Sequence, residues 1–265
     1  MLIVCDVDGT LVDSNKALSD ANKMAIARAR AAGIGFTIIS ARPRSGMAWI
    51  ADALTLNVPM GAFNGGIVFD RSGAVMHHET IDPAVARGVI ALMAEAPVDR
   101  WVFADDRWYA SSGAGLHVEH EKKASAREPI VTDDMEALLD HADKITFVSD
   151  DAPLLKHWCD RAAEAFGGRA TVAQSQTYYL DVTARGANKG DGIAALAKAM
   201  GVDLADTVAI GDQANDLAMF ARAGRSIAMG NAPDAVKAKA GVVTLSNDDS
   251  GVAYAIETMI LKEPA

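Results

Sequence analysis

Residues 1–15 read MLIVCDVDGTLVDSN, and this stretch decides how the rest of the chain is interpreted. The apolar run over residues 2–5 predicts a buried strand, and Asp6, Asp8 and Gly9 follow it closely. Side chains two residues apart in a strand point to the same side. Both carboxylates are therefore expected at one spot if the strand geometry extends through Asp8. We interpret the pattern as a strand end that carries chemistry, rather than as a solvated Asp-Gly turn.

A second acidic strand end occurs late in the chain, in the stretch TVAIGDQANDLAMF. Its apolar run is followed by Asp212, and a helix is expected from Asn215, with Asp216 beside it. Asn215 or Asp216 could instead serve only as a helix cap. Ligands of open α/β sheets bind at the carboxyl ends of the strands. The two acidic ends together therefore predict a cluster of up to four carboxylates.

Such a cluster needs compensating positive charge. Two unit charges about 4 Å apart repel by roughly 4 kcal/mol at an effective dielectric constant of 20. A divalent cation removes this repulsion, and hard oxygen ligands favour Mg²⁺ completed by water and phosphate oxygens. The sequence has no cluster of Cys and His that would favour zinc. His117 and His120, in HVEH, are expected to be surface histidines.

Three further residues are candidates for binding an anion. Ser40 ends an apolar run in TIISARP, where its hydroxyl and the following N–H groups could hold a phosphate, unless it only caps the next helix. Lys189 begins a predicted helix, where a lysine opposes the helix dipole, so helix propensity does not explain it. Arg42 could bind the same anion or pair with a surface carboxylate.

Strand-like and helix-like patterns alternate at both ends of the chain, which predicts an α/β fold with a Rossmann-like, doubly wound parallel sheet. Strands are expected over residues 2–5, 36–39, 60–63, 207–210 and 226–229, a hairpin around residues 71–73, and helices over 19–32, 43–54, 190–200, 215–223 and 232–240. Ser19 is expected to cap the first helix.

The middle of the chain has a different pattern, which predicts an inserted α+β unit. Helices are expected over residues 83–96, 133–141 and 153–166, strands over 145–148, 170–173 and 178–182, and a hairpin around Asp105 and Asp106. The predicted domains are therefore a core of residues 1–81 and 187–265 and a cap of residues 82–186.

Composition excludes several classes of protein. The chain has 265 residues and a formal net charge of −10, without a basic cluster, which argues against a nucleic-acid partner. Two cysteines, Cys5 and Cys159, suggest a reducing compartment. No segment approaches the roughly 18 apolar residues of a membrane span. The apolar start also lacks the features of a secretory signal. We therefore expect a cytoplasmic protein without membrane contact, whose oligomeric state the sequence does not predict.

Four pieces in this order, DVDGT, Ser40, Lys189 and GDQAND, resemble the haloacid dehalogenase superfamily of phosphotransferases. The long insertion between Ser40 and Lys189, together with NGG at residues 64–66, resembles the Cof-type branch, which carries an α+β cap domain. Members are mostly Mg²⁺-dependent phosphatases that act on sugar phosphates and other small phosphomonoesters. The resemblance therefore implies this activity, this cofactor and a small-molecule substrate.

The resemblance also implies a role for each matched residue. Asp6 would be the nucleophile that forms an aspartyl-phosphate, and Asp8 the general acid for the leaving alcohol and then the base for water. Ser40 and Lys189 would bind the transferring phosphoryl group. Mg²⁺ would be held by Asp6, the backbone carbonyl of Asp8, and Asp212.

The remaining predicted residues would support this site. Asn215 and Asp216 would stabilise the metal shell, with Asp216 positioning Lys189 or a metal-bound water. Gly9, which frees the backbone to turn sharply, and Asn64 are the other predicted supporting residues. Asp8 must carry a proton in the first half-reaction. Its pKa is therefore expected to be raised in the substrate complex.

Other functions remain open at this point. A hexose phosphomutase on the same scaffold would need extra basic residues in the cap, for which the candidates are Arg87, Arg100, Arg107, Lys122, Lys123 and Arg127. A signalling receiver domain would need only about half this length, and a non-catalytic phosphate-ligand sensor would have no need of Asp8. The cap is expected to set the substrate, and its candidate residues are Trp101, Trp108, Tyr109, His117 and Tyr178.

Overall fold

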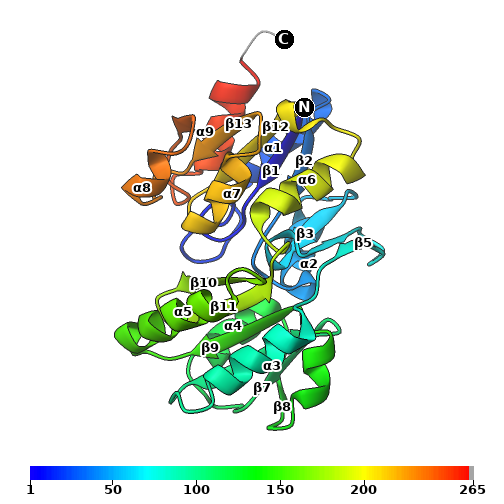
Figure 1. The fold of residues 1–265 in the computed structure, drawn as a ribbon. Helices are drawn as coiled ribbons and strands as arrows, with labels where there is room; N and C mark the ends of the chain where they lie inside the picture. The colour runs from blue at the N-terminus through cyan, green and yellow to red at the C-terminus, as the bar shows by residue number, and fades with distance from the viewer. Residues whose placement is uncertain (263–265) are drawn as a thin grey trace. The chain divides into compact units, whose positions relative to one another are not determined.

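The computed structural model describes residues 1–262 and forms two compact units (Figure 1). The first unit contains residues 1–41, residues 48–77 and the chain from Lys189 onward. The second contains residues 42–47 and 78–188. The second unit is thus an insertion in the first, and the two are described separately below.

The first unit is built on a five-stranded sheet in the order β14-β13-β12-β1-β2, and every pairing in it is parallel. The strands are β1 (Leu2–Cys5), β2 (Gly35–Ile38), β12 (Thr207–Gly211), β13 (Arg225–Ala228) and β14 (Val242–Val243). Leu2 pairs with Thr207 on one side and with Gly35 on the other. The predicted parallel α/β sheet is confirmed.

Helices cover this sheet because its central strands are apolar on both faces. Leu2 and Val4 pack in one core cluster with residues of α6 (Lys189–Ala199) and α7 (Leu217–Phe220). Ile3 and Cys5 alternate with them and are also fully buried, so the opposite face is covered as well. There α1 (Asp20–Ala31) packs against β2 and α9 (Gly251–Ala255).

A small three-stranded sheet follows the second strand, and its first two strands are antiparallel. Its order is β3-β4-β5, with β3 (Met60–Ala62), β4 (Ile67–Phe69) and β5 (Val75–His78), and it contains the predicted hairpin. A single parallel bridge from Ile39 to Gly61 connects it to the end of β2. Between β2 and β3 lies α2 (Arg44–Ala53), and between β3 and β4 the short 3-10 helix η1 (Phe63–Gly65).

The second unit is a six-stranded mixed sheet in the order β10-β11-β9-β6-β7-β8. The strands are β6 (Asp99–Ala104), β7 (Arg107–Ala110), β8 (Ile130–Val131), β9 (Lys144–Val148), β10 (Ala170–Gln176) and β11 (Tyr179–Ala184). Its pairs are antiparallel, except that β7 and β8 are parallel. Helices α3 (Pro83–Leu92) and α5 (Ala152–Phe166) share one apolar core with the sheet.

Local sequence explains several of these elements. The Ser19 side chain accepts a hydrogen bond from the Asn22 N–H at 3.2 Å, so this residue caps α1 as expected. Asp105 and Asp106 both have positive φ, 53° and 58°, which suits the two-residue turn of the β6–β7 hairpin. Aspartate tolerates this left-handed region better than most residues.

Other elements differ from the sequence-based expectation. The expected helix over 133–141 is the short 3-10 helix η2 (Glu136–Asp140), and that over 215–223 is a 3-10 turn, η4 (Ala214–Asp216), followed by α7. The helix over 232–240 shortens to α8 (Asp234–Lys237). Sequence patterns did not predict α4 (Val118–Ser125), β8, β14, α9 or the π-helical turn η5 (Ile256–Ile260). The charged α4, VEHEKKAS, has little apolar periodicity, and no side chain caps it.

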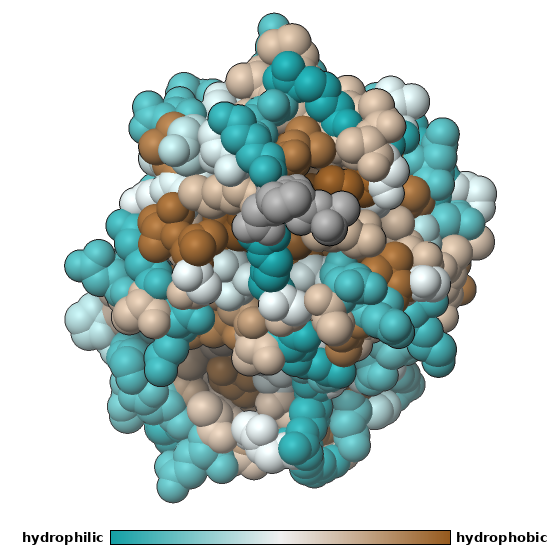
Figure 2. Space-filling view, turned by 90° about the horizontal axis from the view of Figure 1, so that it is seen from above, coloured by the Kyte–Doolittle hydropathy of each residue, from teal (hydrophilic) through white to brown (hydrophobic). Residues whose placement is uncertain are grey.

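The surface carries scattered apolar residues. Figure 2 shows several groups of hydrophobic side chains separated by hydrophilic ones on the face that it draws. Met24 is 58% exposed and Tyr254 is 43% exposed. Scattered exposure of this kind is ordinary and predicts no partner by itself. Within residues 1–262, every helix is too short or too polar to cross a bilayer.

Candidate active site

The two acidic loops lie at the carboxyl ends of adjacent strands. The β1 strand ends at Cys5, and the Asp6 N–H continues its ladder by donating to the Ile210 carbonyl at 2.9 Å. The neighbouring strand β12 ends at Gly211, so Asp212 leaves the sheet beside Asp6. The parallel pairing of β1 with β12 therefore brings together two residues that are far apart in sequence.

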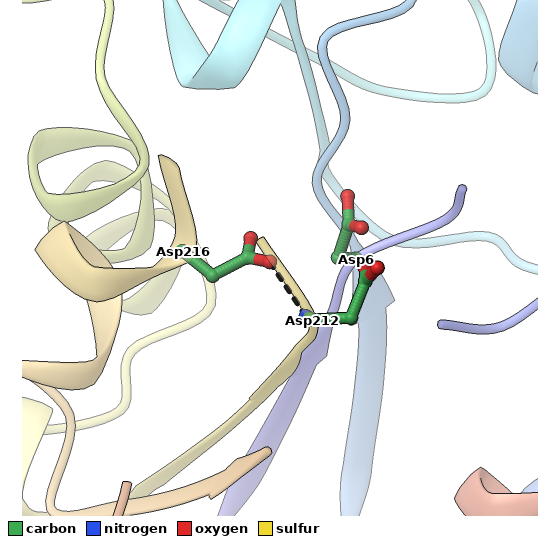
Figure 3. A group of neighbouring side chains, drawn as sticks. All are labelled: Asp6, Asp212 and Asp216. Atoms are coloured by element: carbon green, nitrogen blue, oxygen red, sulfur yellow. Dashed lines mark hydrogen bonds between the residues drawn. The ribbon is translucent and has the colours of Figure 1, made fainter. Parts of the chain in front are cut away.

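Three buried carboxylates meet at this point. One ligand oxygen from each of Asp6, Asp212 and Asp216 lies within 4.8 Å of the others (Figure 3). The structure thus brings the predicted metal ligands Asp6 and Asp212 together and adds Asp216 as a third acidic side chain. In Figure 3, Asp6 and Asp212 project from the strand ends, whereas Asp216 reaches in from the helical segment beside them.

Lys189 supplies positive charge to this cluster. Its Nζ donates to Asp6 Oδ1 at 2.6 Å and to Asp216 Oδ1 at 2.5 Å, and the residue is only 1% exposed. Burial alone would lower the pKa of Lys189, but the charges of Asp216 and Asp6 outweigh it and raise the pKa above its ordinary value. Lys189 is therefore a fixed ammonium at the start of α6.

Asp216 orients its surroundings through both of its oxygens. Oδ1 accepts from Lys189, and Oδ2 accepts from the N–H groups of Asp212 at 2.7 Å and Gln213 at 2.8 Å. A Cβ at Gly211 would lie 2.4 Å from the Asp216 Cγ, so only glycine fits at the end of β12. Asp216 therefore fixes the loop that carries Asp212.

Asp212 is held by side chains that the sequence analysis did not assign. Its Oδ1 accepts from the Thr10 hydroxyl at 2.8 Å, and its Oδ2 lies 3.4 Å from Asn231 Nδ2. Asn231 Nδ2 also donates to the Gly9 carbonyl at 2.8 Å. Gly9 has a φ of +77°, and a Cβ there would lie 2.4 Å from Asp212 Oδ2. Thr10 stands within the DGT stretch, but nothing in the sequence near Asn231 indicated its position.

The charges of this cluster do not balance. Burial raises the pKa of Asp6 well above its usual range, and burial together with Asp216 raises that of Asp212. Three carboxylates share one ammonium, Lys189, so ionising all of them leaves excess negative charge. The all-oxygen donor set and the missing positive charge both fit a hard divalent cation. The cluster is thus of a metal-binding type.

Asp8 has a different environment. Its Oδ1 accepts from Lys16 Nζ at 2.7 Å, and its side chain is 33% exposed. Because β1 ends at Cys5, regular strand geometry does not extend through Asp8. The three-carboxylate cluster consists of Asp6, Asp212 and Asp216, and the Asp8 side chain pairs with Lys16 instead.

Ser40, Asn64 and Asn215 are connected through hydrogen bonds. The Ser40 carbonyl accepts from the Asn64 N–H at 2.7 Å, and Ser40 is buried. Asn64 has a φ of 58°, and its Oδ1 accepts from Asn215 Nδ2 at 3.1 Å. These bonds connect the loop after β2 to the loop that carries Asp216. Asn215 thus contacts Asn64, and its expected support of a metal shell stays a prediction.

Arg42 lies in the segment over residues 42–47, which groups with the second unit. The residue is buried, and its guanidinium donates to the Gly46 carbonyl at 3.1 Å. This bond closes the first turn of the segment. The role of Arg42 in anion binding stays a prediction.

Comparison with known proteins places this geometry in a family. The family model for haloacid dehalogenase-like hydrolases matches residues 3–256. The chain belongs to this family. The haloacid dehalogenase (HAD) fold therefore accounts for the parallel sheet, the inserted second unit and the acidic strand ends, and the resemblance inferred from DVDGT and GDQAND is confirmed.

Curated relatives and a solved structure agree with this assignment. The chain is 30% identical to the 5-amino-6-(5-phospho-D-ribitylamino)uracil phosphatase YwtE of Bacillus subtilis, and the match covers 97% of each chain. It is 27% identical to the pyridoxal phosphate phosphatase YbhA of Escherichia coli, over 98% of each chain. A HAD-like hydrolase from Bacteroides thetaiotaomicron superposes with a TM-score of 0.86 at 28% identity, covering 97% of this chain and 98% of the other. The protein is accordingly a HAD-type phosphatase, a phosphoric monoester hydrolase.

Proposed function

We propose that this protein is a Mg²⁺-dependent phosphatase that hydrolyses small phosphomonoesters, among them sugar phosphates, through an aspartyl-phosphate on Asp6. The observation that carries the proposal is the pairing of the Asp6 carboxylate with Lys189 inside a buried acidic cluster. A carboxylate is repelled by a phosphate dianion. A nucleophilic aspartate therefore needs fixed positive charge beside it, which is what Lys189 provides.

In the first half-reaction, an Asp6 oxygen attacks phosphorus and the ester P–O bond breaks. Asp8 gives its proton to the leaving alkoxide, so that a neutral alcohol departs. Lys189 stabilises negative charge next to the attacking oxygen, and the Ser40 hydroxyl is proposed to bind a phosphoryl oxygen. The enzyme is left with phosphate esterified to Asp6 and with Asp8 as a carboxylate.

In the second half-reaction, water attacks the aspartyl-phosphate. Asp8 accepts a proton from the water, the P–O bond to Asp6 breaks, and inorganic phosphate leaves. Asp6 returns to a carboxylate and Asp8 to an acid. The same Asp8 oxygen therefore donates and then regains one proton in each turnover.

The residues that would hold the cation are the carboxylates of Asp6 and Asp212, with the Asp8 backbone carbonyl as implied by the family resemblance. When bound, Mg²⁺ supplies positive charge that lowers the repulsion between the Asp6 carboxylate and the phosphate of the substrate. Asp216 already uses both oxygens on Lys189 and backbone N–H groups, so we assign it to orientation rather than to coordination.

The range of substrates follows from the relatives only at a coarse level. One relative is named for a phosphorylated ribitylaminouracil and another for pyridoxal phosphate. Both names denote small organic phosphomonoesters. Sugar phosphates stay our specific proposal. Of the candidate specificity residues in the second unit, Trp101 and Trp108 are each 1% exposed and pack edge to face against one another, so they belong to its core. The residues proposed to discriminate among substrates are therefore Tyr109, His117 and Tyr178, which are partly exposed.

Phosphate release from a panel of small phosphomonoesters, with Mg²⁺ and with a chelator, tests the proposal. We expect release that depends on Mg²⁺. Mass spectrometry of acid-quenched enzyme should also show phosphate on the peptide that contains Asp6. Isomerisation of hexose phosphates without phosphate release would instead identify a phosphomutase. Binding of phosphoesters without turnover would indicate a sensor.

A further inference from the structure

The loop over residues 13–17 has a tightly defined backbone. Asp13 Oδ1 accepts from the N–H groups of Asn15 at 2.9 Å and Ala17 at 2.8 Å. The Asp13 N–H donates to the Ala17 carbonyl at 3.0 Å, and the Lys16 N–H donates to the Asp13 carbonyl at 3.0 Å. These bonds fix the position of Lys16 relative to the strand-end loop before it.

Lys16 is held in an uncommon conformation and points back to Asp8. Its φ is +64°, in the left-handed region that non-glycine residues seldom occupy. Its Nζ lies 2.7 Å from Asp8 Oδ1. The Asp8 backbone is itself fixed by a bridge to Val12. Both ends of this ion pair therefore rise from ordered backbone.

Stability does not explain this arrangement. The Lys16 side chain is 48% exposed and that of Asp8 is 33% exposed, and ion pairs at such positions stabilise a fold little. A left-handed lysine costs conformational energy that a glycine at the same position would not. A strained residue that aims its side chain at one partner is a common sign of a functional constraint.

We infer that Lys16 is a positioning residue for Asp8: its ammonium holds Oδ1 and so directs Oδ2, the oxygen that carries the proton, to the leaving group. The ammonium favours the ionised carboxyl, and the negative charge of the bound phosphate ester opposes this preference, so Asp8 carries its proton in the substrate complex. This inference rests on the proposed function, in which Asp8 is the general acid. The ammonium binds one carboxylate oxygen and restricts rotation about the side-chain bonds of Asp8. Alignment of this kind makes proton transfer efficient, because the donor oxygen must lie within hydrogen-bond reach of the departing atom.

Leaving-group dependence tests the inference. An alkyl phosphate such as glycerol 2-phosphate needs a proton on its departing oxygen, whereas p-nitrophenyl phosphate releases a stable anion. The ratio kcat/KM reports the steps up to alcohol release. For Lys16→Met we expect kcat/KM to fall about tenfold with the alkyl phosphate and less than about twofold with the aryl phosphate. Lys16→Arg should retain most of the activity on both.

Three controls separate positioning from folding. Lys16→Gly should show the same kinetic loss as Lys16→Met, with a melting temperature at least as high, because glycine relieves the left-handed strain. Lys23→Met removes a comparable exposed ion pair, with Asp20 at 3.0 Å, and should leave both substrates unaffected. Asp8→Asn should show a larger selective loss with the alkyl phosphate than Lys16→Met.

The outcomes distinguish this inference from the proposed function. If the wild type releases no phosphate, or Asp8→Asn shows no selectivity between the two substrates, the assignment of Asp8 fails. If Asp8→Asn is selective and Lys16→Met loses both activities equally or neither, the role of Lys16 is refuted while the proposed function stands. An equal kinetic loss from Lys23→Met would likewise refute it.

Discussion

Two clusters of one cation with two carboxylates, one in each unit, lie in contrasting environments. In the first unit, Lys189 bonds to Asp6 and Asp216, and all three side chains are buried. In the second unit, Arg87 bonds to Glu136 at 2.6 Å and to Asp140 at 2.8 Å, and all three side chains are exposed. Each cation thus has two acidic partners, one set inside the protein and the other in water.

The difference shows why only one of the clusters is a candidate for chemistry. Water and salt screen the excess charge around Arg87, whose pKa is raised by its hydrogen bonds to Asp140 and Glu136. Inside the first unit, burial instead raises the pKa of Asp6 and Asp212. Excess negative charge there must be removed by protons or by a bound cation, and a bound cation would also attract a phosphate ester.

Among the variants that test this contrast, Asp6→Asn is expected to show the largest effect. The amide keeps the size of the side chain but cannot attack phosphorus, so we expect kcat to fall by a factor on the order of 10⁴. Phosphate release from p-nitrophenyl phosphate in Mg²⁺ measures it. Asp20→Asn, at an exposed position, is the matched control and should keep full activity. Undiminished turnover in Asp6→Asn would remove Asp6 from the role of nucleophile.

Lys189→Met is expected to produce the next largest effect, this time on stability. Removing the ammonium leaves Asp6 and Asp216 buried without their common partner. Breaking a buried pair in this way costs about 3–5 kcal/mol. Urea unfolding in the presence of a chelator measures the loss.

The control for this variant comes from the second unit. Lys122 bonds to the exposed Glu119 and Glu128, each at 2.8 Å. Lys122→Met removes the same number of ion pairs at the surface and should leave the unfolding midpoint unchanged within error. Similar losses in Lys189→Met and Lys122→Met would mean that burial does not distinguish the two kinds of cluster.

The sequence was sufficient to predict the regular parts of the first unit. Short apolar strands separated by capped helices predict a parallel sheet, and the ends of β1 and β12 identify Asp6 and Asp212 as neighbours. Lys189 was found because a lysine at a helix start lacks a local explanation. Its observed partners, Asp6 and Asp216, supply one.

The remaining features depend on contacts that local patterns do not encode. The hydrogen bonds from Asn231 to Gly9 and Asp212 depend on the pairing of β13 with β12, which places the loop after β13 beside the site. The helix α4 is polar and has no side-chain cap, so neither periodicity nor capping indicates it. Lys16 lies in a polar loop, where nothing in the sequence shows that its side chain folds back to Asp8.

A smaller effect is expected from the linkage of pH to cation binding. A carboxyl group whose pKa is higher in the folded state than in the unfolded state stabilises the fold at pH values below its unfolded pKa of about 4. This stabilisation is lost as the pH rises through the folded-state pKa. Chelated protein should therefore lose stability as Asp6 and Asp212 ionise. A divalent cation at this cluster would bind the ionised form, so the proposed stabilisation by Mg²⁺ should be greater at about pH 8 than at about pH 5.

Thermal unfolding measures this linkage. A cation bound at about 100 times its Kd contributes roughly 2.7 kcal/mol, which corresponds to several degrees in a chain of this size. Asp212→Asn removes one ionisable ligand. It should reduce the rise in melting temperature that Mg²⁺ causes, and also the increase of that rise with pH. If Mg²⁺ raised the melting temperature by the same amount at both pH values, the cation would not be held by these carboxylates.

The smallest effect is expected from Arg87→Ala, in the exposed cluster. Glu136 and Asp140 are then left in water rather than in the interior, so no uncompensated buried charge results. The midpoint of thermal unfolding and phosphate release should both match the wild type. Arg87 is also one of the basic residues that a phosphomutase would need for a bisphosphate, yet it is already bonded to two carboxylates at the surface. A loss of activity on hexose phosphates in this variant would show that the exposed cluster participates in substrate binding, and the contrast between the two clusters would fail.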